Sequence, residues 1–101
     1  MFVYNITLKI EPGMDAEWVQ WQQEVHIPEV MATGLFTEYK FFRLLDQDDS
    51  DGGTYIVQYF AAHRADYEKY IAEHAPELRR RALAAWGERF VAFRTIMEVV
   101  N

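Results

Sequence analysis

Apolar and polar side chains alternate without interruption over residues 2–10. Successive side chains of a strand point to opposite faces, so this pattern predicts a strand. The turn formers Pro12 and Gly13 follow it and predict its end. One face of the strand would carry Phe2, Tyr4, Ile6, Leu8 and Ile10, and the other Val3, Asn5, Thr7 and Lys9.

A helical repeat begins after this turn. Trp18, Trp21 and Val25 have the i, i+3, i+7 spacing of an amphipathic helix, and both tryptophans are most simply core residues. Pro28 lacks a backbone donor and restricts the residue before it. We therefore expect a kink or a fresh short turn over residues 28–32.

Three further segments predict strands, namely residues 35–45, 54–61 and 89–100. The polar residues 46–53 join the first two as a hairpin. The last two strands carry apolar residues on both of their faces. Such strands are typical of a sheet that is covered on both sides.

Two helices are predicted between the third and fourth strands. The first covers residues 64–73, and Pro76 suits the first turn of the second, where its missing N–H is not needed. The residues expected to face the core are Tyr67, Tyr70, Ile71 and His74 in the first helix and Leu78, Ala82, Ala85 and Trp86 in the second.

The predicted order is β-α-β-β-α-β, which is the ferredoxin-like arrangement of the α+β class. It has a four-stranded antiparallel sheet with the helices on one face, and at 101 residues the chain is one domain, residues 1–101. A second copy of the sheet is the simplest cover for the other face, because a two-fold dimer uses one self-complementary patch. We expect a homodimer.

Composition narrows the class of partner. The net charge is −6, with 16 acidic against 10 basic side chains, so a nucleic acid is not an expected partner. The chain has no cysteine, which excludes disulfides and thiolate metal sites. Its first residues alternate like a strand rather than a signal peptide, and no apolar run reaches the ~20 residues needed to span a membrane. We expect a soluble cytoplasmic protein without a membrane partner.

The segments HIPEVMATG at 26–34 and AEHAP at 72–76 resemble a bacterial family of domains of unknown function. The resemblance covers nearly the whole chain. That family is placed in the dimeric α/β-barrel superfamily, with antibiotic-biosynthesis monooxygenases, haem-degrading monooxygenases, muconolactone isomerases and chlorite dismutases. The resemblance implies the fold and the dimer, and it implies no activity because a fold does not determine a function.

Two histidines are candidate catalytic residues. His74 shares the predicted buried stripe of its helix, where a neutral imidazole could serve as a general base or could be a core residue with satisfied nitrogens. His26 lies at the end of the first helix, where it could face a ligand or interact with the helix dipole. His26 and Glu29 have i, i+3 spacing, but Pro28 lies between them, so no metal site is expected.

Asn5 is the third candidate, since its amide could orient a substrate if its face of the strand lines the barrel. Haem-degrading relatives use an asparagine early in the first strand with a histidine on the second helix, so the resemblance implies that Asn5 and His74 could act together. Those relatives also carry a tryptophan at the start of that helix, where this chain has residues 63–65, His-Arg-Ala. We expect no cofactor.

Three polar residues within apolar strands are candidate ligand contacts, namely Arg43, Gln58 and Arg94. A buried arginine needs a carboxylate, which Glu38, Glu98 or an acidic ligand could provide. The loop at 46–53 lacks the spacing of a calcium site, and the one serine excludes a Ser–His–Asp triad.

Two classes of function remain open. The first is a non-catalytic dimer that binds a small molecule or another protein. The second is a cofactor-independent monooxygenase or isomerase that acts on a small organic substrate, with haem degradation as a further alternative. A cavity of several hundred Å³ on the helix-free face of the sheet would favour a ligand binder or an enzyme.

Overall fold

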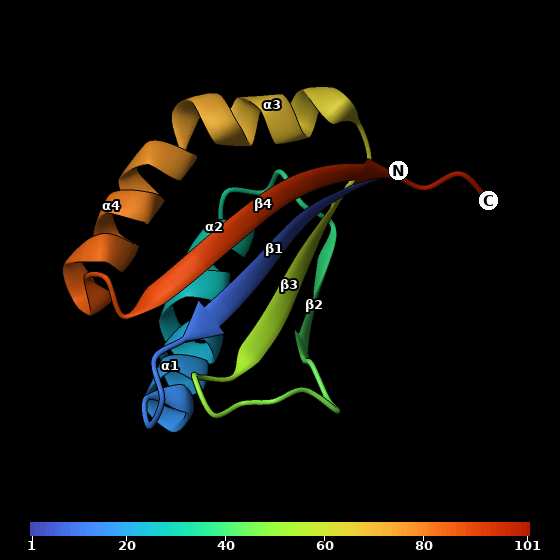
Figure 1. The fold of residues 1–101 in the computed structure, drawn as a ribbon. Coiled ribbons are helices and arrows are strands. Elements are labelled where there is room, and N and C mark those ends of the chain that lie inside the picture. The colour runs from blue at the N-terminus through green and yellow to red at the C-terminus, as the bar shows by residue number, and fades with distance from the viewer.

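The computed structural model describes residues 1–101 and consists of one four-stranded sheet with all helices on one of its faces (Figure 1). The strands run antiparallel in the order β2-β3-β1-β4, which confirms the ferredoxin-like prediction. The elements in chain order are β1 (Phe2–Ile10), α1 (Asp15–Trp21), the π-helix η1 (Gln22–His26), α2 (Ile27–Met31), β2 (Glu38–Arg43), β3 (Thr54–Ala61), α3 (Arg64–Glu73), α4 (Ala75–Trp86) and β4 (Phe90–Glu98).

The register of β1 separates the two faces of the sheet. Tyr4 lies between Tyr59 of β3 and Ile96 of β4, and its side chain points to the helices. The neighbouring residue Asn5 therefore points to the helix-free face. The alternation over residues 2–10 predicted both the ends of this strand and the assignment of its two faces.

The core lies between the helices and the sheet and is built largely from aromatic rings. Tyr4 is at its centre, with its ring centroid 5.3–6.3 Å from four other aromatic rings. These rings belong to Phe36, Tyr59, Tyr67 and Tyr70. Trp18 of α1 is 1% exposed and packs against Phe41 and Tyr55 at the other end of the sheet.

The helical segment before Pro28 contains a wide turn that the sequence pattern did not predict. The backbone N–H of Ile27 donates to the carbonyl of Gln22, five residues earlier, instead of four. This wide turn takes up one extra residue, so the buried positions after it are shifted by one. Val25, which we expected in the core, is 41% exposed, and Ile27 and Val30 are buried.

Two smaller predictions were also wrong. The strand predicted over 35–45 is shorter at both ends, since β2 covers only Glu38–Arg43. Phe36, which precedes β2, is buried in the core between the helices and the sheet. In α4, Ala85 is exposed, whereas Leu78, Ala82 and Trp86 are buried as expected. None of the helices is both long enough and apolar enough to cross a membrane.

Candidate functional site

A cavity of about 60 Å³ lies between the sheet and the helical segments α1, η1 and α4. It can hold about two water molecules or a molecule of similar size, because one water occupies roughly 30 Å³ of liquid. It lies on the helix side of the sheet and not on the helix-free face, where a cavity of several hundred Å³ would have favoured a ligand binder or an enzyme. Its lining is Tyr4, Ile6, Leu8, Trp18, Trp21, Gln22, His26, Val57, Tyr59, Tyr70, Leu78, Arg79, Ala82, Phe90 and Arg94.

The wide turn η1 brings two polar residues to the cavity. Gln22 and His26 are its first and last residues, and both belong to the lining. Gln22 is only 4% exposed, and its Oε1 has no hydrogen-bond partner. Buried side-chain oxygens normally accept a hydrogen bond, and this oxygen lacks a donor. Single π-turns inside α-helices occur frequently at functional sites.

His26 is half-buried and stacks on Trp21, with the ring centroids 5.0 Å apart. Burial lowers the pKa of His26, and the positive charge of Arg94 lowers it further, while Glu29 opposes both effects. His26 is therefore neutral near pH 7, with one ring nitrogen free to accept a proton. A neutral imidazole beside a cavity has the properties of a general base.

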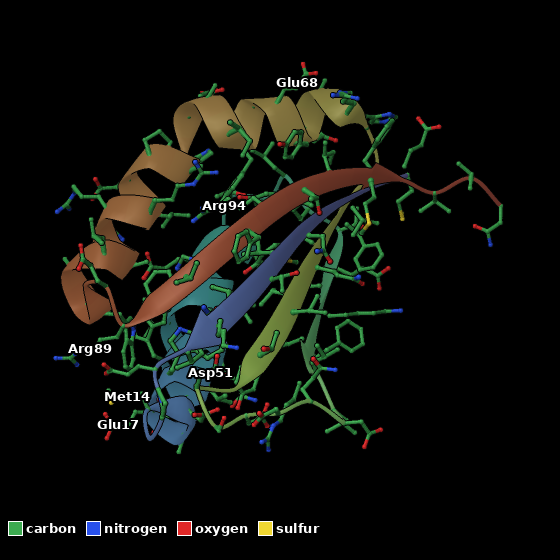
Figure 2. All side chains as sticks on the ribbon, in the orientation of Figure 1. Met14, Glu17, Asp51, Glu68, Arg89 and Arg94 are labelled. Atoms are coloured by element: carbon green, nitrogen blue, oxygen red, sulfur yellow. The ribbon has the colours of Figure 1, made fainter.

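Two arginines also contribute to the lining. Arg94 of β4 pairs across the sheet with Ile6, so its side chain lies on the helix side of the sheet (Figure 2). Arg94 forms no hydrogen bond or ion pair, whereas Arg79 of α4 donates one hydrogen bond, of 3.1 Å, to the hydroxyl of Tyr4. No carboxylate belongs to the lining.

The buried tyrosines of the lining stay uncharged. Burial raises the pKa of Tyr59 and of Tyr70 well above the usual tyrosine value, and the neighbouring phenols add to the increase. With His26 neutral as well, the only charges in the lining near pH 7 are those of Arg79 and Arg94.

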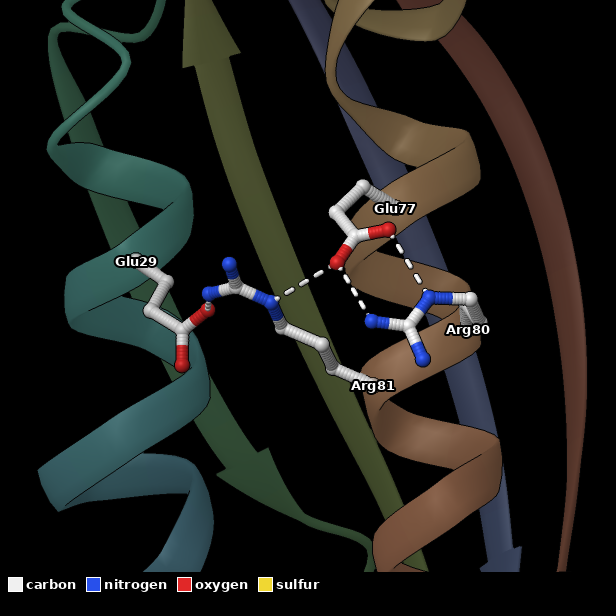
Figure 3. A network of polar contacts seen from close by, with 4 residues as sticks. All are labelled: Glu29, Glu77, Arg80 and Arg81. Atoms are coloured by element: carbon white, nitrogen blue, oxygen red, sulfur yellow. Dashed lines mark hydrogen bonds and ion pairs between the residues drawn. The ribbon is translucent and has the colours of Figure 1, made fainter.

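A network of ion pairs connects the two helices on either side of this region (Figure 3). Arg81 of α4 donates to Glu29 of α2 over 2.8 Å and to Glu77 over 3.2 Å. Arg80 donates to both oxygens of Glu77, and these contacts lower the pKa of Glu77 to about 2. Exposed ion pairs contribute little individually, so the network orients α4 more than it stabilises the fold.

Only two of the six sequence candidates, His26 and Arg94, belong to the cavity lining. Gln58 donates to Asn5 over 3.3 Å on the helix-free face, so both lie on the far side of the sheet from the cavity. Arg43 is exposed and pairs with Asp49.

His74 lies outside the cavity, because α3 ends at Glu73 and the backbone of His74, with φ −120° and ψ −39°, is not helical and separates α3 from α4. Its side chain borders a shallow surface depression with Glu29, Glu73 and Glu77. The resemblance to haem-degrading relatives requires Asn5 and His74 on one site. They lie on opposite sides of the sheet, so a haem held by this pair does not fit the structure.

Two further polar residues of the lining, Gln22 and Arg79, are not among the sequence candidates. Gln22 follows Trp18 by four residues and so shares its helix face, which is a pattern that could have identified it. Arg79 stands in a run of three arginines. Arg79 precedes Ala82 by three residues and Trp86 by seven, so it lies on their face of the helix, and this spacing could have identified it.

Acid should destabilise the fold through His26. Its pKa is lowered in the folded state, so below about pH 6.5 the unfolded chain binds the proton more readily, and stability falls as the pH drops toward the folded-state pKa. Urea unfolding at about pH 7.5 and about pH 5.5 should show a smaller loss for His26→Gln than for the unchanged protein. His63→Gln, at an exposed position, is the control, and equal losses in all three proteins would contradict the prediction.

Several solved structures share this fold. A cofactor-independent oxygenase from Streptomyces nogalater, SnoaB, superposes with a TM-score of 0.71 at 13% identity, covering 99% of this chain and 94% of its own. An ethyl tert-butyl ether degradation (EthD) family protein from Bacillus halodurans gives 0.67 at 16% identity, covering 99% and 100%. A dimeric ferredoxin-like protein of unknown function from Jannaschia sp. CCS1 gives 0.61 at 15% identity, covering 98% and 100%.

At these identities the likeness shows the fold, and the activities named for those proteins are theirs. No curated protein matches the chain. A domain family does match it, over residues 1–100, and its description is "Domain of unknown function (DUF4286)". The match spans nearly the whole chain and agrees with the resemblance seen in the segments at 26–34 and 72–76. The chain therefore belongs to the DUF4286 family, and its fold is ferredoxin-like.

Proposed function

We propose that this protein is a homodimer that binds a small organic molecule in the cavity between the sheet and the helices of each protomer. The observation that carries the proposal is the unpaired Oε1 of Gln22 in the cavity lining. Leaving a buried acceptor without a partner costs about 1–3 kcal/mol, and a ligand with a donor group would recover that energy. The apolar walls and the few polar groups that converge on the cavity are typical of small-molecule sites.

Filling the cavity tests this proposal. The small side chain of Ala82 on α4 lines the cavity, so Ala82→Leu should place an isobutyl group in the space. A library of very small organic molecules, matched to a cavity of about 60 Å³, is screened by NMR, with the Gln22 amide and the Trp21 indole N–H as reporters. Fragments that shift these signals should stop doing so in Ala82→Leu.

Ala84→Leu is the matched control, because Ala84 lies on the same helix, is exposed and does not line the cavity. Fragments should shift the same signals in this variant as in the unchanged protein. A library without any fragment that shifts them, or fragments that bind Ala82→Leu undiminished, would contradict the proposal.

The helix-free face supports the dimer. It carries four apolar side chains that are each at least two-fifths exposed: Phe42, Val91, Phe93 and Met97. At the centre of the face, Asn5 and Gln58 are hydrogen-bonded to each other. Apolar side chains gathered on one exposed face often mark a contact between proteins, and solved structures of this fold are described as dimeric. A second copy would cover the patch through a self-complementary two-fold contact.

Phe93→Glu should convert the dimer to a monomer. Phe93 is 64% exposed in the single chain, and a two-fold dimer would bury two new carboxylates at this position. We expect the dimer dissociation constant to rise by at least about 100-fold, and light scattering at micromolar concentration should give the monomer mass. Leu83→Glu, which changes an exposed leucine of α4, should remain dimeric. A monomer mass for the unchanged protein would refute the dimer.

A second candidate is a cofactor-independent monooxygenase or isomerase. The observation in its favour is the half-buried, neutral His26 beside the cavity, which could remove a proton from a bound substrate. Turnover of a substrate found by the fragment screen would be followed as oxygen uptake or as isomer formation. His26→Gln should abolish turnover and retain binding. Retained turnover in this variant would exclude His26 as the base.

A further inference from the structure

Polar side chains cross the centre of the helix-free face, from β2 through β3 and β1 to β4. They form one row of neighbours in the strand register, here called the polar row, which consists of Lys40, Gln58, Asn5 and Thr95. The rows on either side of it are mainly apolar and consist of Glu38, Phe60, Val3 and Met97 and of Phe42, Ile56, Thr7 and Phe93. Asn5 and Gln58 belong to the two central strands, so their amides lie at the middle of the face.

These two amides have hydrogen-bonding capacity left over. Nε2 of Gln58 donates to Oδ1 of Asn5 over 3.3 Å, and Nδ2 of Asn5 donates to the hydroxyl of Thr7 over 3.4 Å. An amide nitrogen carries two hydrogens, so each of these nitrogens has one hydrogen without a partner in the chain. Oε1 of Gln58 accepts no hydrogen bond. The pair therefore presents both donors and an acceptor to whatever covers the face.

Such a pair can bond to a copy of itself. In a dimer whose copies pack face to face, a residue close to the two-fold axis lies opposite its own copy. A charged side chain would meet a like charge there, whereas an amide can donate to and accept from an identical amide. The only charged member of the polar row, Lys40, is exposed on the edge strand β2, with its ammonium 5.5 Å from the ring centroid of Phe60. The middle of the face is thus neutral and self-complementary.

A shift of one copy along the strands would cost these hydrogen bonds. Adjacent rows of one face are separated by two residues, which is about 7 Å in a strand. A copy displaced by one row would bring the amides against apolar side chains such as Phe60 and Ile56. Buried amides without partners weaken association, so the polar row favours one placement of the second copy over its neighbours.

We propose that the two-fold axis of the dimer passes over the Asn5–Gln58 pair, where the amides of one copy hydrogen-bond to the amides of the other. The surrounding apolar side chains supply affinity, and the polar centre selects the arrangement. A single buried asparagine has the same role in coiled coils, where it sets the register of two helices. This inference rests on the dimer of the proposed function, and it adds where the axis lies and which atoms meet there.

Charge complementation at Gln58 tests the position of the axis. Gln58→Glu and Gln58→Lys each place like charges opposite one another, so each variant alone should have a dimer dissociation constant at least about 100-fold higher than that of the unchanged protein. In a mixture of equal amounts, a carboxylate faces an ammonium, and the constant should return to within about tenfold of the original value. Light scattering measures the mass. One variant is labelled with ¹⁵N, so that native mass spectrometry resolves the mixed dimer.

Two further changes complete the experiment. Leu83→Glu and Leu83→Lys are the matched controls, because Leu83 is exposed on α4, on the other side of the sheet. Alone and mixed, both should dimerise as tightly as the unchanged protein. Gln58→Met keeps a side chain of similar length and removes the amide, so Asn5 loses its partners and the dissociation constant should rise by at least about tenfold. Thermal unfolding confirms that each variant is folded.

The outcomes distinguish the arrangement from the dimer itself. If the unchanged protein is a monomer at micromolar concentration, the dimer and its arrangement both fail. If it is a dimer and the two charged variants dimerise as tightly as it does, or if mixing them restores nothing, Gln58 does not face its own copy and only the arrangement is wrong. A Gln58→Met dimer of undiminished affinity would show that no amide hydrogen bond crosses the axis. The cavity on the other side of the sheet is tested separately by the fragment screen.

Discussion

Replacing Trp18 with alanine is expected to lower the free energy of unfolding by about 3–5 kcal/mol. The side chain is 1% exposed, and its ring lies 5.1 Å from the ring of Tyr55 and 5.9 Å from that of Phe41. Its removal would leave a void between α1 and the sheet that a rigid strand cannot fill by relaxing. Urea unfolding followed by circular dichroism measures the change.

Val25→Ala is the control for this prediction, because the simple helical pattern puts Val25 and Trp18 on one buried stripe. In the structure Val25 is exposed, so the change should alter stability by about 0.5 kcal/mol or less. A loss of more than about 1 kcal/mol would show that Val25 is buried and that the wide turn is absent.

Gly52→Ala should lower the free energy of unfolding nearly as much, because the added Cβ would overlap with backbone atoms. Gly52 has a φ of +118°, and an added Cβ would lie 1.8 Å from the carbonyl oxygen of Ile10 at the end of β1. Neither the carbonyl nor the loop can move without breaking the hydrogen bond from the Ile10 N–H to the Gly53 carbonyl. We expect a loss of at least about 3 kcal/mol, measured as a fall in thermal and urea stability.

Gly13→Ala separates strain from steric overlap. Gly13 also has a positive φ, +85°, but an added Cβ would meet no atom within 4 Å. This variant should lose about 1–2 kcal/mol, the cost of a left-handed conformation alone. Equal losses at the two glycines would show that the approach to Ile10 is less close than the structure indicates.

The strands were predictable to within a few residues because a period of two is a strong local pattern. β1 and β3 begin and end where the alternation does, and β4 is shorter than predicted by one residue at its start and two at its end. The strand predicted over 35–45 is wrong at both ends, because β2 covers only residues 38–43. Phe36 is apolar because it packs in the core, although it belongs to no strand. Composition within a segment cannot distinguish these two reasons for an apolar residue.

The candidate site was less predictable, because it depends on how the helices are placed. His74 was selected by its spacing from Tyr67 and Ile71, and this argument failed because α3 ends one residue earlier. His26 and Arg94 were selected separately, and only the folded chain shows that they share a cavity. Ala82 has the smallest side chain of the cavity lining. No local pattern reports such a void.

The wide turn η1 offers a route by which such a site can arise during evolution. A π-turn amounts to one residue inserted into an otherwise regular helix, and the flanking turns keep their positions. Removing the exposed Glu24 would give Ile27 an ordinary i→i−4 bond and leave Trp18 and Val30 in the core. Inserting a single codon into a regular α-helix can therefore create a widened turn that carries Gln22 and His26 to the cavity. The protein keeps its fold during that step.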